Sequence, residues 1–233
     1  MMPSTQPADY LVAHRGDRQG GGENTLDGFD AAAKAGARFG ECDIQFTGDL
    51  VPVVLHDNRL KRLCDRADIK ATETPLNELR RACEPNFSLA TLAELMAWLA
   101  QTENMTLFIE LKPPVRKRLT DRSIAKRIAQ LLPETLLPRL IVISQSAALV
   151  DACSAEIDCP TGWVNEGHRP PSARFDYIFM PWQRADEIQH WQTHKVKVGL
   201  YTVNDAAKAL QLRQAGADFI ETNFFSRMVQ DIG

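Results

Sequence analysis

Residues 35–41 read Ala-Gly-Ala-Arg-Phe-Gly-Glu, and residues 215–221 read Ala-Gly-Ala-Asp-Phe-Ile-Glu. Each stretch is typical of a helix that ends at a glycine and turns directly into a strand. The similarity between them indicates one helix–strand unit that is used near both ends of the chain. Because such joints recur in many α/β folds, the pattern between the two stretches has to decide the architecture.

Between these stretches, short apolar runs with strand character alternate with longer amphipathic runs. The predicted strands are Tyr10–Ala13, Arg38–Phe46, Val51–Leu55, Thr106–Leu111, Leu140–Ile143, Thr161–Val164, Tyr177–Met180, Val196–Val203 and Ala217–Glu221. The predicted helices are Leu26–Ala37, Leu89–Ala100, Arg116–Leu132, Ala147–Ala155, Ala185–His194 and Ala206–Ala215. With the second and third runs counted as one unit, eight strands follow at a spacing of roughly 29 residues, which predicts an α/β fold of the (β/α)₈ TIM-barrel type.

The chain length agrees with this prediction, because 233 residues suit one barrel domain, 1–233. Residues 58–88 contain Pro75 and Pro85 and show no regular pattern. They are predicted to form a small insertion after the second strand.

Composition excludes several classes of protein. The 27 basic and 30 acidic side chains give a net charge of −3, which argues against nucleic acid as a partner. The five cysteines are scattered without a Cys-x-x-Cys pair, as in a reduced protein rather than a disulfide framework or a zinc site. Met1–Asp9 is polar, unlike a signal peptide, and we expect a cytoplasmic protein without stable membrane insertion. The helix-rich exterior leaves a homo-oligomer open.

Charged side chains gather at the predicted ends of three successive strands. Glu41 and Asp43 share a strand face at i and i+2, and Glu110 and Lys112 repeat that spacing on the next unit. His14 ends the first strand, so that a barrel would bring all three groups to its C-terminal rim. Three carboxylates without clustered cysteine or histidine ligands favour a hard cation, Mg²⁺ or Ca²⁺.

The remaining polar residues extend this pattern towards phosphate chemistry. Arg15 and Lys112 suit an anionic phosphate group, and His14 and His56 can act as general acid and base near neutral pH. Taken singly, each of these motifs is more often a turn, a strand edge or a loop. The run Glu23–Thr25 can be explained entirely as a helix start with Asn24 as N-cap. The joint arrangement predicts metal-assisted acid–base cleavage of a phosphate ester.

The same residues carry a resemblance to a known family. The motifs are His14–Gly16, Glu23–Thr25, Glu41–Asp43, Thr47–Asp57, Thr91–Glu94, Ile109–Lys112, Tyr201–Asn204 and Gly216–Thr222. With them the chain resembles the glycerophosphodiester phosphodiesterases, most closely the cytosolic bacterial members, over nearly its whole length.

This resemblance implies a TIM-type barrel whose divalent metal is bound by Glu41, Asp43 and Glu110. It implies His14 and His56 as the acid–base pair, and Arg15 and Lys112 as phosphate ligands. The expected small-molecule substrate is a glycerophosphodiester, and the products are glycerol 3-phosphate and an alcohol such as choline, ethanolamine or glycerol. We favour His14 as acid and His56 as base, although spacing does not decide between them.

Several positions depart from the family pattern in what would be the pocket wall. Tyr201 stands where tryptophan is usual, Asn223 where aspartate is usual, and Gln145 where an aromatic residue is typical. Tyr201 and Trp182 are the predicted substrate-binding residues of that wall. These differences leave the choice of head group open.

Three other functions compete with this prediction. The first is phospholipase D-like cleavage of a phospholipid or lysophospholipid, for which Phe224, Phe225 and Trp182 are candidates for an apolar rim. The second is a non-catalytic barrel that binds phosphate metabolites, which would not need the complete set of carboxylates and histidines. The third is a barrel isomerase or aldolase with Lys112 as its lysine, to which the neighbouring Glu110 is poorly suited.

Overall fold

The computed structural model describes residues 6–233, and its centre is a closed ring of eight parallel strands. The strands are β1 (Leu11–His14), β2 (Phe39–Phe46), β6 (Thr106–Leu111), β7 (Leu140–Ser144), β8 (Thr161–Val164), β9 (Tyr177–Pro181), β10 (Lys197–Tyr201) and β11 (Phe219–Thr222). β1 pairs with β11 on one side and with β2 on the other, which closes the ring. The predicted (β/α)₈ barrel is therefore confirmed. The prediction that residues 1–9 form no signal peptide lies mostly outside the described residues.

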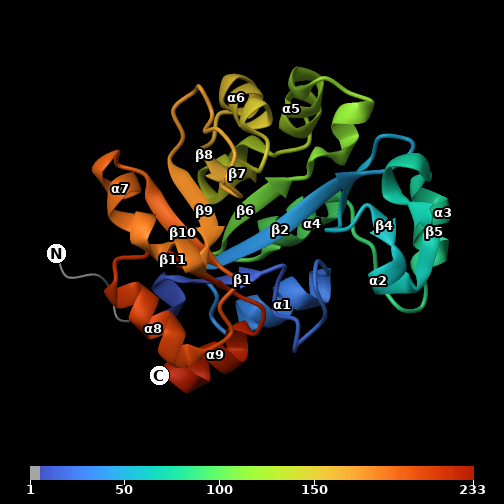
Figure 1. Cartoon of the computed structure of the whole chain (residues 1–233). Helices are drawn as coiled ribbons and strands as arrows, with labels where there is room; N and C mark the ends of the chain where they lie inside the picture. The colour runs from blue at the N-terminus through green and yellow to red at the C-terminus, as the bar shows by residue number, and fades with distance from the viewer. Residues whose placement is uncertain (1–5) are drawn as a thin grey trace.

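Helices surround the strands on the outside of the ring (Figure 1). They are α1 (Leu26–Lys34), α4 (Leu92–Gln101), α5 (Asp121–Ala129), α6 (Ala147–Glu156), α7 (Ile188–Thr193), α8 (Ala206–Gln214) and α9 (Phe225–Ile232). Short 3₁₀ turns are η1 (Pro7–Asp9), η3 (Pro113–Lys117), η4 (Glu134–Arg139) and η5 (Trp182–Glu187). None of the helices within residues 6–233 is long and apolar enough to cross a bilayer.

Two predicted helices are interrupted in the structure. The run Arg116–Leu132 divides into η3 and α5, because Thr120 leaves the helical conformation and caps α5 by accepting from the Ser123 amide. The run Ala185–His194 divides into the end of η5 and α7; Arg184, inside η5 and just before this run, has non-helical backbone angles. The helix α9 was not predicted, although Phe225 and Met228 bury one of its faces.

Residues 58–88, predicted to be irregular, contain regular elements. These are β4 (Arg59–Leu60), α2 (Lys61–Cys64), β5 (Arg66–Lys70), η2 (Ala71–Glu73) and α3 (Leu76–Cys83). They follow β3 (Pro52–Val54), which runs antiparallel to β2, and they lie to one side of the ring (Figure 1). Leu60, Leu79 and Cys83 belong to a small buried cluster of their own, so this segment packs around a separate apolar centre.

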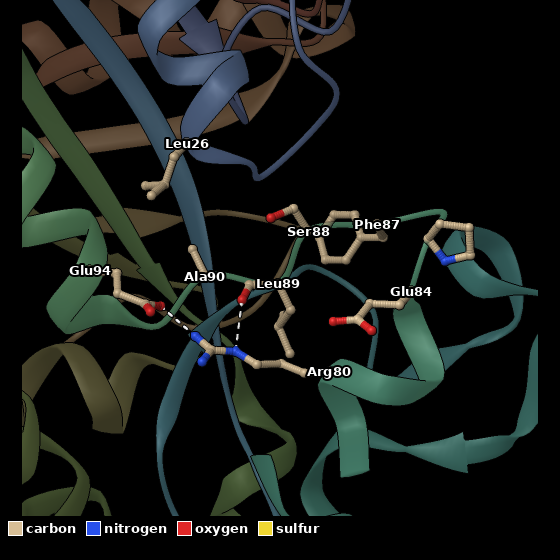
Figure 2. A pocket seen from close by; sticks show the side chains of 9 residues that line it. Leu26, Arg80, Glu84, Phe87, Ser88, Leu89, Ala90 and Glu94 are labelled. Atoms are coloured by element: carbon tan, nitrogen blue, oxygen red, sulfur yellow. Dashed lines mark hydrogen bonds and ion pairs between the residues drawn. The ribbon is translucent and has the colours of Figure 1, made fainter. Parts of the chain in front are cut away.

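Arg80 on α3 connects this segment to the barrel (Figure 2). Its Nε donates to the Leu89 carbonyl oxygen at 3.3 Å, and its Nη2 donates to Glu94 Oε2 at 2.6 Å. Glu94 also completes the capping box of α4 with Thr91. A cavity of about 380 Å³ lies beside this contact and includes Phe87 in its lining.

The inside of the ring is apolar at its centre and polar at its C-terminal end. Val12, Phe108, Phe179 and Phe219 belong to one buried cluster, with the Phe108 ring edge-on to the rings of Phe179 and Phe219. On β6, Glu110 follows Phe108 at i+2 and therefore shares its inward face. The carboxylates of the rim thus stand directly above a packed apolar centre, which keeps them away from bulk water.

Candidate active site

Strand register brings the predicted site residues together at the C-terminal rim of the barrel. His14 on β1 pairs with Glu41 on β2, and Asp43 on β2 pairs with Glu110 on β6. Because adjacent parallel strands present paired residues side by side, four positions far apart in the sequence become neighbours. This arrangement at three successive strands is the one predicted from the sequence.

Three carboxylates of this group form an acidic triad that could hold a metal ion. One carboxylate oxygen each from Glu41, Asp43 and Glu110 lies within 4.8 Å of the others, and all three side chains are buried. Glu41 Oε1 has no hydrogen-bond partner among the described residues. A buried oxygen without a donor is costly, and an all-oxygen set is what Mg²⁺ and Ca²⁺ prefer. The residues therefore fit a hard divalent cation.

The charges around the triad are unevenly balanced. Lys112 Nζ lies 2.8 Å from Asp43 Oδ1 and 2.8 Å from Glu110 Oε1. Burial acts to raise the pKa of Asp43, but Lys112 and Arg15 outweigh it and hold that pKa below its usual range. Burial, with the charge of Asp43 beside it, raises the pKa of Glu41 well above its usual range. Glu41 is thus the carboxylate that most needs further positive charge.

Arg15 reaches two members of the triad from the loop after β1. Its backbone is left-handed (φ 61°), and its amide donates to Glu41 Oε2 at 3.1 Å. Its guanidinium Nε lies 2.9 Å from Asp43 Oδ2. A guanidinium stays charged at every ordinary pH, and its planar donors also suit phosphate oxygens.

Asn24 has a different role from the one predicted. The N-cap of α1 is Thr25, whose hydroxyl accepts from the Gly28 amide at 3.0 Å. Asn24 is fully buried and makes two hydrogen bonds to Asp43, one to a carboxylate oxygen at 2.8 Å and one from the backbone amide at 3.1 Å. Its left-handed backbone (φ 54°), which asparagine tolerates well, turns it inward. It fixes the position of Asp43.

The two histidines are each held at Nδ1. His14 Nδ1 lies 2.9 Å from Asn223 Oδ1, and His56 Nδ1 lies 2.6 Å from Asp57 Oδ1. Both partners are oxygen acceptors, so Nδ1 carries the proton and Nε2 keeps its lone pair. His14 Nε2 lies 3.8 Å from Glu41 Oε2, beside the triad.

Burial disfavours the protonated form of both imidazoles. Burial, reinforced by Arg15, lowers the pKa of His14 to about 3. Burial also lowers the pKa of His56, against the opposing influence of Asp43. Two neutral rings with a free Nε2 can each accept a proton and later return it.

A cavity of about 100 Å³ opens over these groups. Its lining includes His14, Arg15, His56, Glu110, Lys112 and Tyr201. Trp182, the other predicted wall residue, is not part of the lining, and its ring lies 4.6 Å below the Lys208 ammonium. Of the two aromatic residues, the structure brings only Tyr201 to the cavity.

Glu221 and Gln145 are among the lining residues that were not predicted as site residues. Glu221 on β11 is buried, and its Oε2 lies 4.0 Å from His14 Nε2. Gln145, on the loop after β7, stood out in the sequence only as a departure from the family pattern. A signal for Glu221 existed, because residues 35–41 and 215–221 end in matching glutamates and Glu41 is a predicted ligand.

This fold and this rim site define a TIM-barrel protein with a buried, metal-compatible cluster of carboxylates, histidines and basic groups. A sequence profile of the glycerophosphoryl diester phosphodiesterase family matches residues 14–227, and the chain belongs to this family. Human glycerophosphodiester phosphodiesterase 1 is 36% identical over 123 residues, which make up 48% of this chain and 37% of the human protein. The chain thus spans little more than a third of the length of that relative.

Solved structures share the whole fold. A glycerophosphodiester phosphodiesterase from Parabacteroides distasonis superposes with a TM-score of 0.82 at 21% identity, covering 96% of both chains. An Oleispira antarctica phosphodiesterase, solved with the product sn-glycerol-3-phosphate, superposes with a TM-score of 0.79 at 24% identity over 96% of both chains. At these identities the likeness establishes the barrel.

Proposed function

We propose that this chain hydrolyses glycerophosphodiesters to glycerol 3-phosphate and an alcohol, using one divalent cation, Mg²⁺ or Ca²⁺. The observation that carries the proposal is the buried triad with His14 against Glu41 and with His56 lining the same small cavity as Glu110. Membership of the family supports the reaction class. The product in the Oleispira antarctica structure supports glycerol 3-phosphate as the shared part of the substrate.

Glu41, Asp43 and Glu110 would bind the cation, which when bound polarises the phosphate oxygens. The chain's own cations add to this: Arg15 and Lys112 point into the same cavity and would hold the phosphate. The buried Tyr201 hydroxyl has no hydrogen-bond partner among the described residues. It is therefore free to bind a substrate oxygen.

His14 and His56 would move the protons. One neutral imidazole takes the proton of the attacking oxygen, and the other, protonated beforehand from solvent, gives that proton to the leaving alcohol. Exchange with solvent then returns both rings to their starting states. Asn223 and Asp57 support this by holding the two rings through Nδ1, so that Nε2 faces the reaction.

The competing functions receive less support. Phe225, a candidate for a lipid-facing rim, is fully buried, and Trp182 is covered by Lys208. A barrel that only binds phosphate would have no use for two histidines held through Nδ1. We also place the activity in the cytoplasm, in keeping with five free cysteines.

Release of glycerol 3-phosphate from glycerophosphodiesters tests the proposal. We expect turnover with Mg²⁺ or Ca²⁺, none with chelator, and a loss of about 10²-fold or more in Glu41→Gln, because the variant keeps the shape but removes a ligand charge. Glu78→Gln, an exposed glutamate on α3, is the matched control. Folded protein that releases no product from any diester with either ion would refute the proposal.

A further inference from the structure

A groove of about 570 Å³ adjoins the small cavity, between residues 57–62 and the Lys112–Pro114 segment. We call it the lateral groove. It shares His56, Lys112 and Gln145 with the small cavity, so the two spaces are adjacent and these side chains stand between them. When the phosphate of a diester lies in the small cavity, the alcohol esterified to it therefore reaches the lateral groove within a short distance.

The lateral groove carries two basic groups, Arg59 and Lys61, that form no salt bridge among the described residues. Lys61 is exposed and makes no ion pair or hydrogen bond among the described residues. Arg59 donates to the Ala67 carbonyl oxygen at 3.0 Å and forms no salt bridge with a described carboxylate. Both side chains line the groove, and both have positive charge available to a ligand.

The other charges of the groove are already neutralised. Arg62 Nη2 lies 2.5 Å from Glu23 Oε1, and its Nε lies 2.7 Å from Asp57 Oδ2. Asp57, the only carboxylate among the described lining residues, is also bound to His56. Lys112 is paired with the triad. Arg59 and Lys61 are thus the groove cations that no described carboxylate pairs at salt-bridge distance.

Gln45 supplies an independent polar contact. Its side chain lines the groove but is only 2% exposed, and its Nε2 donates to the His56 carbonyl oxygen at 2.8 Å. Its Oε1 is buried without a hydrogen-bond partner among the described residues. An orphaned buried acceptor is costly, and a hydroxyl donor from a ligand would satisfy it.

We propose that the lateral groove binds the leaving alcohol and selects alcohols that carry hydroxyl groups and an anionic group, such as a second phosphate. The proposal rests on the proposed diesterase function. Cationic alcohols such as choline are the disfavoured class, because aromatic faces and free carboxylates hold quaternary ammonium groups. None of the described lining residues is Phe, Tyr or Trp, and the single carboxylate is paired.

Competing diesters test the selectivity. The probes are glycerophosphoinositol 4-phosphate, whose alcohol is anionic, and glycerophosphocholine, whose alcohol is cationic. Both are assayed with Mg²⁺ at low ionic strength. We expect kcat/KM for the anionic diester to exceed that for the choline diester by about 10-fold, with the difference shrinking as salt screens the groove.

The Lys61→Glu variant tests whether the lateral groove causes the difference in kcat/KM between the two diesters. Lys61 is exposed, so its replacement leaves packing intact, and we expect kcat/KM for the anionic diester to fall about 5-fold to 10-fold through KM. The choline diester should be unaffected or improved. Lys126→Glu, on the exposed surface of α5, makes the same charge change away from the site and should alter neither substrate.

Binding of free inositol 4-phosphate, measured by calorimetry, separates this proposal from the proposed function. Weaker binding to Lys61→Glu than to the parent chain supports the groove even if no diester is hydrolysed. Equal use of both diesters by an active enzyme, unchanged in Lys61→Glu, overturns the selectivity alone. Failure of the parent chain to bind inositol 4-phosphate overturns it as well.

Discussion

At the scale of single residues, the two histidines differ in what surrounds them. His56 lines both the small cavity and the lateral groove, whereas His14 lines only the small cavity and contacts Glu41. If the alcohol leaves through the groove, His56 is the residue beside it. We therefore propose His56 as the acid and His14 as the base, the reverse of the assignment favoured in the sequence analysis.

A diester with a nitrophenol leaving group tests this assignment. Nitrophenolate needs no proton to leave, so removal of the acid costs less on this substrate than on an alkyl diester. We expect His56→Ala to lose about 10²-fold on the alkyl diester but about 10-fold or less on the nitrophenyl diester. His14→Ala should lose similar factors on both. The opposite pattern would make His14 the acid.

Glu221 gives the site a pH-dependent cost in stability. Burial, with the charges of Glu110 and Asp43, raises its pKa to about 8, far above the value of 4.5 for an exposed glutamate. A raised pKa means that the folded state prefers the protonated form. The contribution of that preference to the free energy of unfolding is fully present below pH 4.5 and is lost as the pH rises through about 8.

Glu221→Gln should remove this dependence, because glutamine resembles the protonated side chain. In chelator, we expect the variant to unfold at a progressively higher temperature than the parent between pH 5 and pH 9. The gain at pH 9 should be about 1–3 kcal/mol, since each pKa unit corresponds to about 1.4 kcal/mol and neighbouring carboxylates share the repulsion. Glu78→Gln serves as the control. A gain independent of pH would show that Glu221 is not the titrating group.

The sequence predicted the residues whose neighbours are close along the chain. Glu41 and Asp43 share a strand face by spacing alone, and His14 ends its strand beside them. Glu221 and Asn24 act on partners that are distant along the chain: His14 lies across the seam between β1 and β11, and Asp43 is separated from Asn24 by α1. Local periodicity contains no information about such pairs.

At the scale of elements, the barrel strands were predictable because each is a short apolar run between turns. Residues 58–88 were not, because their elements are two to eight residues long and too short to show a period. What organises them is packing: Arg80 binds both the Leu89 carbonyl and Glu94 on α4. Four side chains of the lateral groove belong to this segment, Asn58, Arg59, Lys61 and Arg62, so its attachment to the barrel decides where Arg59 and Lys61 stand.

The break between η3 and α5 shows a related limit. Arg116–Leu132 has helical residues throughout, yet the Thr120 hydroxyl gives the backbone a competing partner, and a new helix begins there. Pro113 and Pro114 then belong to a separate turn that borders the groove. A threonine inside a helical pattern is therefore a boundary signal as much as a helix residue.

At the scale of the whole molecule, barrel closure concentrates more negative than positive charge at one rim. Glu41, Asp43, Glu110 and Glu221 are buried there, against the cations Arg15 and Lys112. Four acidic groups and two basic groups leave an excess that a divalent cation would balance. The apolar centre beneath prevents water from screening this excess, so the fold itself creates the demand for a cation.

A bound cation should consequently stabilise the fold. A ligand at 100 times its dissociation constant adds about 2.7 kcal/mol, which for a chain of this size raises the melting temperature by about 5–10 °C. We expect that rise with Mg²⁺ or Ca²⁺, measured by differential scanning calorimetry against chelator. Glu41→Gln should lose the rise, while its metal-free form should melt no lower than the parent, because a buried repulsive charge has been removed. Glu78→Gln should behave as the parent chain.

The rise in melting temperature with metal and its loss in Glu41→Gln together distinguish a metal site from a purely internal ion-pair network. If Lys112 and Arg15 alone satisfied the triad, metal would not shift the melting temperature, and Glu41→Gln would leave Lys112 paired as before. If a cation bound elsewhere on the acidic surface, the shift would persist in Glu41→Gln. Only a cation held by the triad makes the shift depend on Glu41, whose Oε1 is the buried carboxylate oxygen that Lys112 and Arg15 leave unpaired.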